Sequence, residues 1–331
     1  MQLMPSWRFW LMACVLASFL SFAPVWSQAP TPTPSPTGSD AKSYVGFGLA
    51  NGQKGDMAGA IAAFNQAITI DAKYAPAYFY RGLAYATQNQ PDQAVVNYDQ
   101  AIQLDPTYVQ AYYQRGSLKG QKGDFDAAVS DFDEVIKLDP KYSPAYYQSG
   151  HVQYFKGDLD GALTRINQAL TLDPNFAFCY FIRGLIGHAR DHRGEALGDF
   201  QKSAGLNFPY GAFWVWISEM ETGQRGLARR DLGDALNKPE SFKPDDLPTA
   251  IGNFLLEKAT LDQLLAHIKA DGSAQSNDQL CKVWFYAGMY SRLSGDAKGA
   301  QANLAKAVAT NSTGSEEFVE ANRELAKLPQ P

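Results

Sequence analysis

Residues 105–140 read DPTYVQAYYQRGSLKGQKGDFDAAVSDFDEVIKLDP, a stretch that begins and ends with an Asp-Pro step. The two steps stand 34 residues apart, and the same spacing leads back to Asp71-Ala72 and on to Asp173-Pro174. A fixed period of this length is typical of a small structural unit that is repeated and stacked on copies of itself. The period therefore predicts the architecture before any single residue is interpreted.

Three further positions recur in the same register: a glycine, an alanine twelve residues later, and a large side chain four residues after that. They are Gly48, Gly82, Gly116, Gly150 and Gly184; Ala60, Ala94, Ala128, Ala162 and Ala196; and Phe64, Tyr98, Phe132, Ile166 and Phe200. Small residues suit the point where two helices of a hairpin cross, and the large residue is expected to fill the gap to the next hairpin. Proline ends the second helix because it cannot continue the hydrogen-bond ladder. The pattern predicts an all-α fold, a right-handed superhelix of tetratricopeptide (TPR) hairpins.

This register divides the chain into segments. Five TPR hairpins are predicted over residues 41–210, at 41–74, 75–108, 109–142, 143–176 and 177–210. Residues 211–280 are expected to hold a degenerate sixth pair and two inserted helices, the second opened by a capping box of Thr260 and Gln263. A late repeat and a closing helix follow in 281–331. The polar residues of that helix, Glu316, Glu320, Arg323 and Lys327, suit the exposed end of a solenoid.

The N-terminal region is of a different kind. Residues 1–29 carry Arg8 before an apolar run, the layout of a secretory signal peptide cleaved after Ser27 or Ala29. An uncleaved membrane anchor is the alternative, whereas lipidation at Cys14 is not expected. Residues 30–40 are rich in Pro and Thr and cannot build a core, so they are interpreted as a linker, with a plain disordered terminus as the alternative. The sequence thus predicts a periplasmic protein, soluble or anchored at this end.

Composition limits the classes of partner. The chain has 331 residues with a net charge of −5, and its charges are interspersed rather than gathered in a basic stripe. Binding to nucleic acid, which requires such a stripe, is therefore not expected.

The C-terminal part carries a more specific resemblance. FLLEKATLDQLLAHIKAD (254–271) and WFYAGMYSRLSGDAKGAQANLAKAVATN (284–311) resemble the C-terminal half of the NlpI-like periplasmic TPR lipoproteins. The resemblance implies an adaptor that binds murein endopeptidases and a tail-specific protease, and it implies a homodimer. A lipobox cysteine at the end of the signal, which that family has, is missing here.

In arrays of this type the first helix of each pair lines a concave groove, mainly through its second, fifth, ninth and twelfth positions. The predicted partner-binding groove comprises Phe79, Leu83, Tyr113, Tyr147, His151, Tyr154, Phe181, Leu185 and His188. Rigid rings of this kind suit an extended peptide or a partner helix. The alternative is that the rings pack against each other or against a folded-back segment.

Two expectations follow for single residues. Tyr147→Ala should weaken partner binding and leave the melting temperature near wild type. Asp133→Ala should do little, because Asp131, Asp133 and Glu134 are expected on the solvent side of a second helix.

Catalytic and cofactor motifs are absent from the sequence, so no enzyme activity and no cofactor are expected. His188 and His192 with Asp191 offer a metal interpretation, but no third spaced ligand accompanies them. Cys179 and Cys281 are interpreted as buried fillers, with a disulfide left open. The preferred function is an exported scaffold or adaptor. The alternative is a secretion or transport accessory that holds an extended substrate in its groove.

Overall fold

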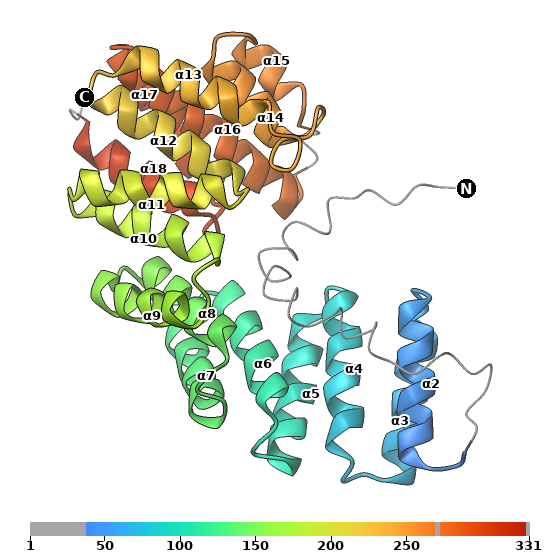
Figure 1. Cartoon of the computed structure of the whole chain (residues 1–331). Coiled ribbons are helices and arrows are strands. Elements are labelled where there is room, and N and C mark those ends of the chain that lie inside the picture. Colours follow the sequence, from blue (N-terminus) through green and yellow to red (C-terminus); the bar gives the residue numbers. More distant parts are fainter. Residues whose placement is uncertain (1–37, 269–271, 329–331) are drawn as a thin grey trace. The chain divides into compact units, whose positions relative to one another are not determined.

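The computed structural model describes residues 38–268 and 272–328, and these residues form helices joined by short turns (Figure 1). The expected all-α fold is confirmed within these ranges. The predicted signal peptide and residues 30–37 of the predicted linker lie outside the described residues. The chain divides into two compact units, and the boundary between them in the sequence falls between Val152 and Gln153.

Unit 1 contains three complete helical hairpins and most of another helix. Its helices are α2 (Ala41–Gln53), α3 (Met57–Ile70), α4 (Ala75–Thr87), α5 (Pro91–Leu104), α6 (Val109–Gln121), α7 (Phe125–Leu138) and the greater part of α8 (Ser143–Lys156). Each of the three hairpins lies within one of the 34-residue ranges that the period predicts.

Unit 2 begins with the end of α8 and continues the alternation of paired helices. It holds α9 (Leu159–Leu172), α10 (Ala177–Ala189), α11 (Arg193–Gly205), α12 (Pro209–Glu221), α13 (Arg225–Leu236), α14 (Leu247–Leu255), α15 (Leu261–Leu265), α16 (Ala274–Leu293), α17 (Ala297–Ala309) and α18 (Glu316–Lys327). Thr260 and Gln263 form the expected capping box at the start of α15.

The turn inside each hairpin requires a left-handed residue. Gly55 and Gly123 occupy it with φ of +81° and +82°, a region that glycine enters without steric cost. Where glycine is missing, Asn89 (φ +59°) and Asp191 (φ +62°) take the same conformation, which short polar side chains tolerate. This explains how the second and fifth hairpins turn without the Gly-Asp pair found in the others.

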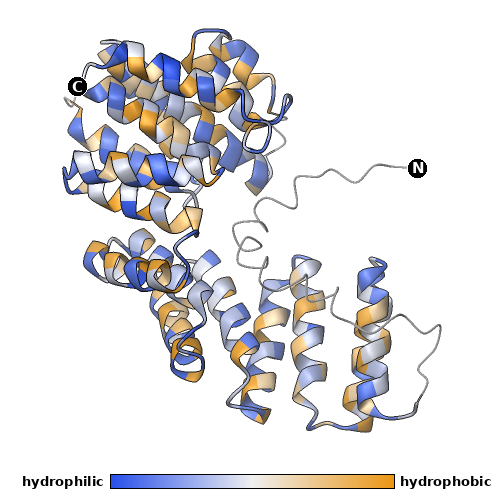
Figure 2. Ribbon diagram, in the orientation of Figure 1, coloured by the Kyte–Doolittle hydropathy of each residue, from blue (hydrophilic) through white to orange (hydrophobic). Residues whose placement is uncertain are grey.

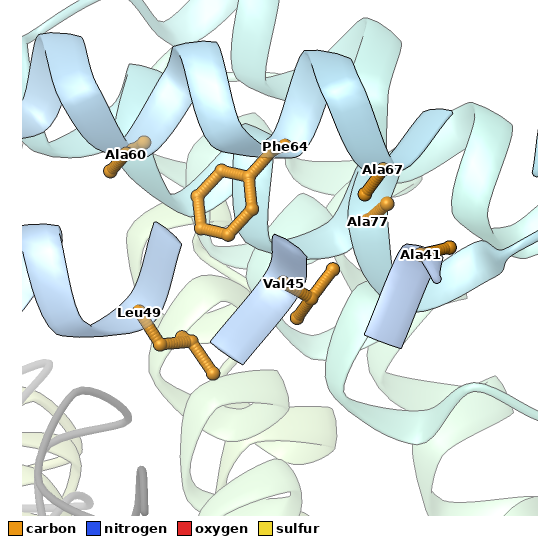
Figure 3. Close-up of a cluster of buried hydrophobic side chains, with 8 residues drawn as sticks. Ala41, Val45, Leu49, Ala60, Phe64, Ala67 and Ala77 are labelled. Atoms are coloured by element: carbon orange, nitrogen blue, oxygen red, sulfur yellow. The ribbon is translucent and has the colours of Figure 1, made fainter. Parts of the chain in front are cut away.

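The recurring glycine gives space to a ring of the same hairpin. A Cβ atom added to Gly82 would lie 2.7 Å from the Tyr98 ring, and one added to Gly184 would lie 2.5 Å from Phe200. In the first hairpin, Phe64 of α3 points toward α2 (Figure 3). The expectation that the large residue fills the gap to the next hairpin was therefore incomplete, because the ring first packs on its own glycine.

Arginine at the seventh position of a hairpin joins two second helices. Arg115 of α6 donates two hydrogen bonds to Asp131 of its own hairpin (2.5 and 2.9 Å) and one to Asp99 of the preceding hairpin (2.6 Å). Asp131 is 3% exposed and also pairs with Lys119 at 2.9 Å. The expectation that Asp131 belongs to the surface was wrong, because the carboxylate is needed inside to bind this guanidinium.

Equivalent side chains repeat the arrangement sixteen residues to either side of the arginine. Arg81 binds Asn97 and Asn65, and Arg183 binds Asp199 and Asn167. Tyrosines at the fourth position support it: Tyr146 and Tyr180 donate to the carbonyls of Pro140 and Pro174, and the Arg183 guanidinium lies 5.3 Å from the centre of the Tyr180 ring. The hairpins are thus joined by polar contacts as well as by apolar packing.

Hydrophobic and hydrophilic residues are mixed along individual helices (Figure 2). This mixture suits helices that are covered on one side and exposed on the other. Across residues 38–268 and 272–328, no helix combines the length and hydrophobicity needed to span a membrane.

Candidate protein-binding site

The rings at the fifth position are core residues. Phe79, Tyr113, Tyr147 and Phe181 are between 1% and 4% exposed. They were expected to be open anchors in a binding groove, and their burial corrects that expectation. Because almost none of the surface of these rings is accessible, a partner would meet the side chains around them.

In three hairpins a second aromatic residue near the end of the hairpin packs on the fifth-position ring. The ring centres are 4.9 Å apart for Phe79 and Tyr108, 5.4 Å for Tyr113 and Tyr142, and 5.0 Å for Phe181 and Phe208. The sequence contains the signal for the contacts of Tyr108 and Tyr142, since Tyr74, Tyr108, Tyr142 and Phe176 also follow the 34-residue period. Phe208 lies two positions before the next member of that series. Aromatic pairs in such offset or edge-on arrangements stabilise the core they share.

We call the side of the first helices that carries the ninth and twelfth positions the first-helix face of each unit. In unit 1 this face retains two accessible members of the predicted set, Leu83 of α4 and His151 of α8, both half-buried. The His151 ring is stacked on Tyr147 with the centres 5.4 Å apart. Leu83 packs at the margin of the cluster around Phe79.

In unit 2 the predicted residues meet another part of the chain. Tyr154, Leu185 and His188 are at most 3% exposed. The Tyr154 hydroxyl donates to Glu320 of α18 at 2.5 Å, although the two residues are 166 positions apart in the sequence. The C-terminal helix therefore lies against the first-helix face of unit 2, where a folded-back segment was one of the two alternatives.

The helix α18 turns an acidic side inward. Glu317, Glu320 and Glu324 are no more than 3% exposed, and Ala321 is fully buried between them. A polar outer surface was expected at this end of the solenoid, and the burial of Glu320 contradicts it. The reason is that hydroxyl or basic side chains of the facing helices lie close to all three carboxylates.

These side chains belong to α8 and α16. Tyr286 donates to Glu317 at 3.4 Å, and Lys282 lies 3.8 Å from the same carboxylate. Arg292 lies 3.1 Å from Glu324. Burial raises the pKa of Glu317 to about 7, because the positive charge of Lys282 only partly offsets the loss of solvation.

Glu221 at the end of α12 is a second centre of charge. His188 Nε2 lies 3.1 Å from it, and both Arg193 and Arg292 form ion pairs with it. Burial alone would raise the pKa of Glu221, but the hydrogen bonds and charges of His188 and Arg292 lower it to about 2. His188 thus lies beside a buried carboxylate that also binds two arginines in unit 2.

The two cysteines of the described residues are enclosed in the core. Cys179 and Cys281 are free and fully buried, and burial raises the pKa of both thiols, that of Cys281 to about 12. Such thiols are poor nucleophiles at neutral pH. Among the described residues, no group of three or more His, Cys, Asp and Glu side chains is arranged to hold a metal ion.

Two family models of the tetratricopeptide repeat match this chain. One family model, "TPR repeat", matches residues 48–89 and 82–123, and another, "Tetratricopeptide repeat", matches residues 109–142 and 143–176. The last two matches coincide with two of the hairpin ranges that the period predicts. No curated protein matches the chain.

Solved structures of other repeat proteins are similar over parts of the chain. MamA is 28% identical over 48% of this chain and 93% of its own, with a TM-score of 0.47. YrrB, described as a TPR protein with an unusual peptide-binding site, is 21% identical over 51% and 87%, with a TM-score of 0.46. PilF of Pseudomonas aeruginosa is 13% identical over 86% and 97%, also with a TM-score of 0.46. The family matches show that this chain carries tetratricopeptide repeats over residues 48–176.

Proposed function

We propose that this protein is an adaptor that binds other proteins through its repeats, with the first-helix face of unit 1 as the binding surface. The observation that carries the proposal is the run of tetratricopeptide repeats over residues 48–176. Stacked helical hairpins present an extended surface made of the same positions in successive units, which suits a peptide or a partner helix. Leu83 and His151 are the members of the predicted set that remain accessible there.

The finer proposal is that the adaptor is exported and works in the cell envelope. Its support is the apolar run after Arg8 and the resemblance of residues 254–271 and 284–311 to NlpI-like lipoproteins. On this proposal the partners are a murein endopeptidase and a tail-specific protease, and the chain forms a homodimer. N-terminal sequencing of the exported protein should find Gln28 or Pro30 first, and an intact Met1 in a soluble cytoplasmic fraction would contradict export.

The binding proposal is tested by capture from an envelope extract followed by quantitative mass spectrometry. The bait is the full chain, as wild type and as Leu83→Gln/His151→Gln. The matched control is Val96→Gln, because Val96 is a 66% exposed apolar residue on the second helix α5. Helicity and melting temperature are recorded for all three baits, so that a loss of binding is not confused with unfolding.

We expect wild type and the control to capture the same partners and the double variant to lose most of them. Equal capture by the double variant would place the binding surface elsewhere. Recovery of a murein endopeptidase and a tail-specific protease would support the envelope adaptor. Recovery of unfolded exported chains would favour the alternative, an accessory that holds an extended substrate.

A further inference from the structure

The inward side of α18 is defined by charge. Its buried residues are Glu317, Glu320, Ala321 and Glu324, which lie on one side of the helix because residues three, four and seven positions apart share a face. Its apolar residues Phe318, Val319 and Leu325 are only half-buried. Carboxylates therefore make up most of the fully buried side of this helix.

The facing side chains are basic or phenolic. Tyr154 of α8 and Tyr286 of α16 donate hydroxyl hydrogen bonds to Glu320 and Glu317. Lys282 and Arg292, both on α16, approach Glu317 and Glu324. Together the two hydroxyl donors and the two cations form an elongated surface that matches glutamates spaced three and four residues apart along a helix.

Charged groups of α18 and of the surface that faces it would keep ionic partners if the helix were displaced. Lys282 also pairs with Asp278 at 2.6 Å, and Arg292 also pairs with Glu221. On the helix itself, Arg323 pairs with Glu320, and Lys327 pairs with Glu324 at 2.6 Å. After removal of α18, Lys282 and Arg292 would therefore each keep an ionic partner. Glu320 and Glu324 would each keep one on the released helix.

Burial of charged groups of this kind stabilises the docking of a helix less than burial of the same area of apolar side chains. Placing ion pairs in the interior costs desolvation energy that their attraction barely repays, whereas apolar packing has no such cost. The helix is also the last element that the structure describes, and six residues separate it from α17, which ends at Ala309. An element with few fully buried apolar side chains is expected to open at a lower free energy than the core.

We propose that the surface formed by Tyr154, Lys282, Tyr286 and Arg292 is a binding site for an acidic helix of a partner protein, and that α18 occupies this site in the unbound chain. The partner helix carries glutamates with the spacing of Glu317, Glu320 and Glu324 and displaces α18 when it binds. The chain's own helix thus competes with the partner and sets the concentration at which the partner binds. This site uses unit 2 only and does not depend on the adaptor proposal for unit 1.

The test uses a fluorescent peptide of residues 312–328 and the full chain. Glu320→Lys/Glu324→Lys places two positive charges against the basic surface and should release α18 while leaving the site intact. The matched control is Asn322→Lys/Ala326→Lys, which adds lysines at two positions of the same helix that lie outside its buried side. Binding is measured by fluorescence anisotropy, and the control peptide carries the two lysines in place of Glu320 and Glu324.

We expect the released variant to bind the wild-type peptide at least about tenfold more tightly than wild type or the control variant, because no helix competes for the site. The lysine peptide should bind none of the proteins. Absence of peptide binding to a folded released variant would overturn the proposal. A dimer of wild-type chains that exchange α18 would also overturn it, because the occupant would then be a second copy.

Hydrogen exchange of the wild-type chain decides the matter if the released variant does not fold. Displacement requires the amides of α18 to exchange faster than those of α16, with a rate that rises with salt concentration as the ion pairs are screened. Exchange of α18 and α16 in one common event would show that the helix is a fixed part of the core, and the proposal would fail.

Discussion

Arg115 shows how one side chain holds three helices together. It lies on α6, and its partners Asp131 and Asp99 lie on the second helices of its own and of the preceding hairpin. A guanidinium is suited to this task because its planar fork can bind two carboxylates at fixed angles. The ion pair also explains why a charged residue is buried at position 131.

Arg115→Met should destabilise the protein by about 2–4 kcal/mol, because Asp131 would stay buried with Lys119 as its remaining cation. Urea unfolding followed by circular dichroism measures the change. The control is Lys122→Met, which breaks the pair with Asp92, whose side chains are 52% and 84% exposed, and should cost less than about 1 kcal/mol. Equal losses in the two variants would contradict an internal linking function for Arg115.

Tyr147→Ala should now be expected to lower stability. The ring is 1% exposed, and removal of a large buried ring typically costs about 3–5 kcal/mol. The melting temperature should fall clearly, whereas His151→Ala, which removes a half-buried ring, should lower it much less. An unchanged melting temperature for Tyr147→Ala would show that the ring lies in a groove after all.

At the scale of the helical element, the crossing of α6 and α7 depends on small residues. Ala128 is fully buried, and its carbonyl oxygen would lie 3.2 Å from a Cβ atom added to Gly116. Ala128→Leu should overpack this crossing and destabilise the protein by about 1–3 kcal/mol, as seen in urea unfolding. Ser130→Leu places the same side chain at an exposed position of α7 and should have little effect. Similar unfolding of both variants would mean that the crossing lies elsewhere.

The docking of α18 should depend on pH through Glu317. Burial raises the pKa of this group from 4.5 to about 7, so the folded state holds the proton more tightly than the unfolded state. Its stabilisation is complete below pH 4.5 and is lost as the pH rises to about 7, by up to about 3 kcal/mol. Glu221, whose pKa is lowered to about 2, has the opposite dependence and loses its contribution as the pH falls from 4.5 to about 2.

Glu317→Gln should therefore reduce the loss of stability between pH 4.5 and 7, measured as melting temperature against pH. Some loss should remain, because burial also raises the pKa of Glu219 to about 7. Glu257→Gln is the control, since the Glu257 side chain is 53% exposed in its pair with Arg229. A profile of Glu317→Gln that follows wild type throughout this range would show that the Glu317 carboxyl is ionised when folded.

For the molecule as a whole, the sequence predicted what is local and repeated. Glycine, alanine and a large side chain at fixed spacing predict a hairpin because the contacts among these three positions lie within one 34-residue unit. The same local logic predicted the capping box of Thr260 and Gln263. Tyr108 and Tyr142 also follow the period. Their recurrence was enough to predict that the fifth-position rings are covered.

The occupant of the unit 2 face could not be predicted in this way. Glu320 meets Tyr154 across 166 positions, and nothing in the periodic pattern relates the two. A helix with glutamates and lysines is also typical of an exposed surface, because charged residues are seldom buried unless paired. Its burial depends on donors contributed by helices far away in the sequence.

The arginine links have a consequence for the evolution of chain length. Each arginine bonds residues sixteen positions before and after it, so the loss of residues 75–108 would bring Asn65 to the place that Asp99 holds for Arg115. Asn65 already accepts a hydrogen bond from Arg81, sixteen positions further along the chain. Duplication or deletion of a complete 34-residue unit therefore restores the bonds at the junction. An insertion of only part of a unit between an arginine and one of its partners would change their spacing, so selection should favour gene rearrangements that preserve this unit.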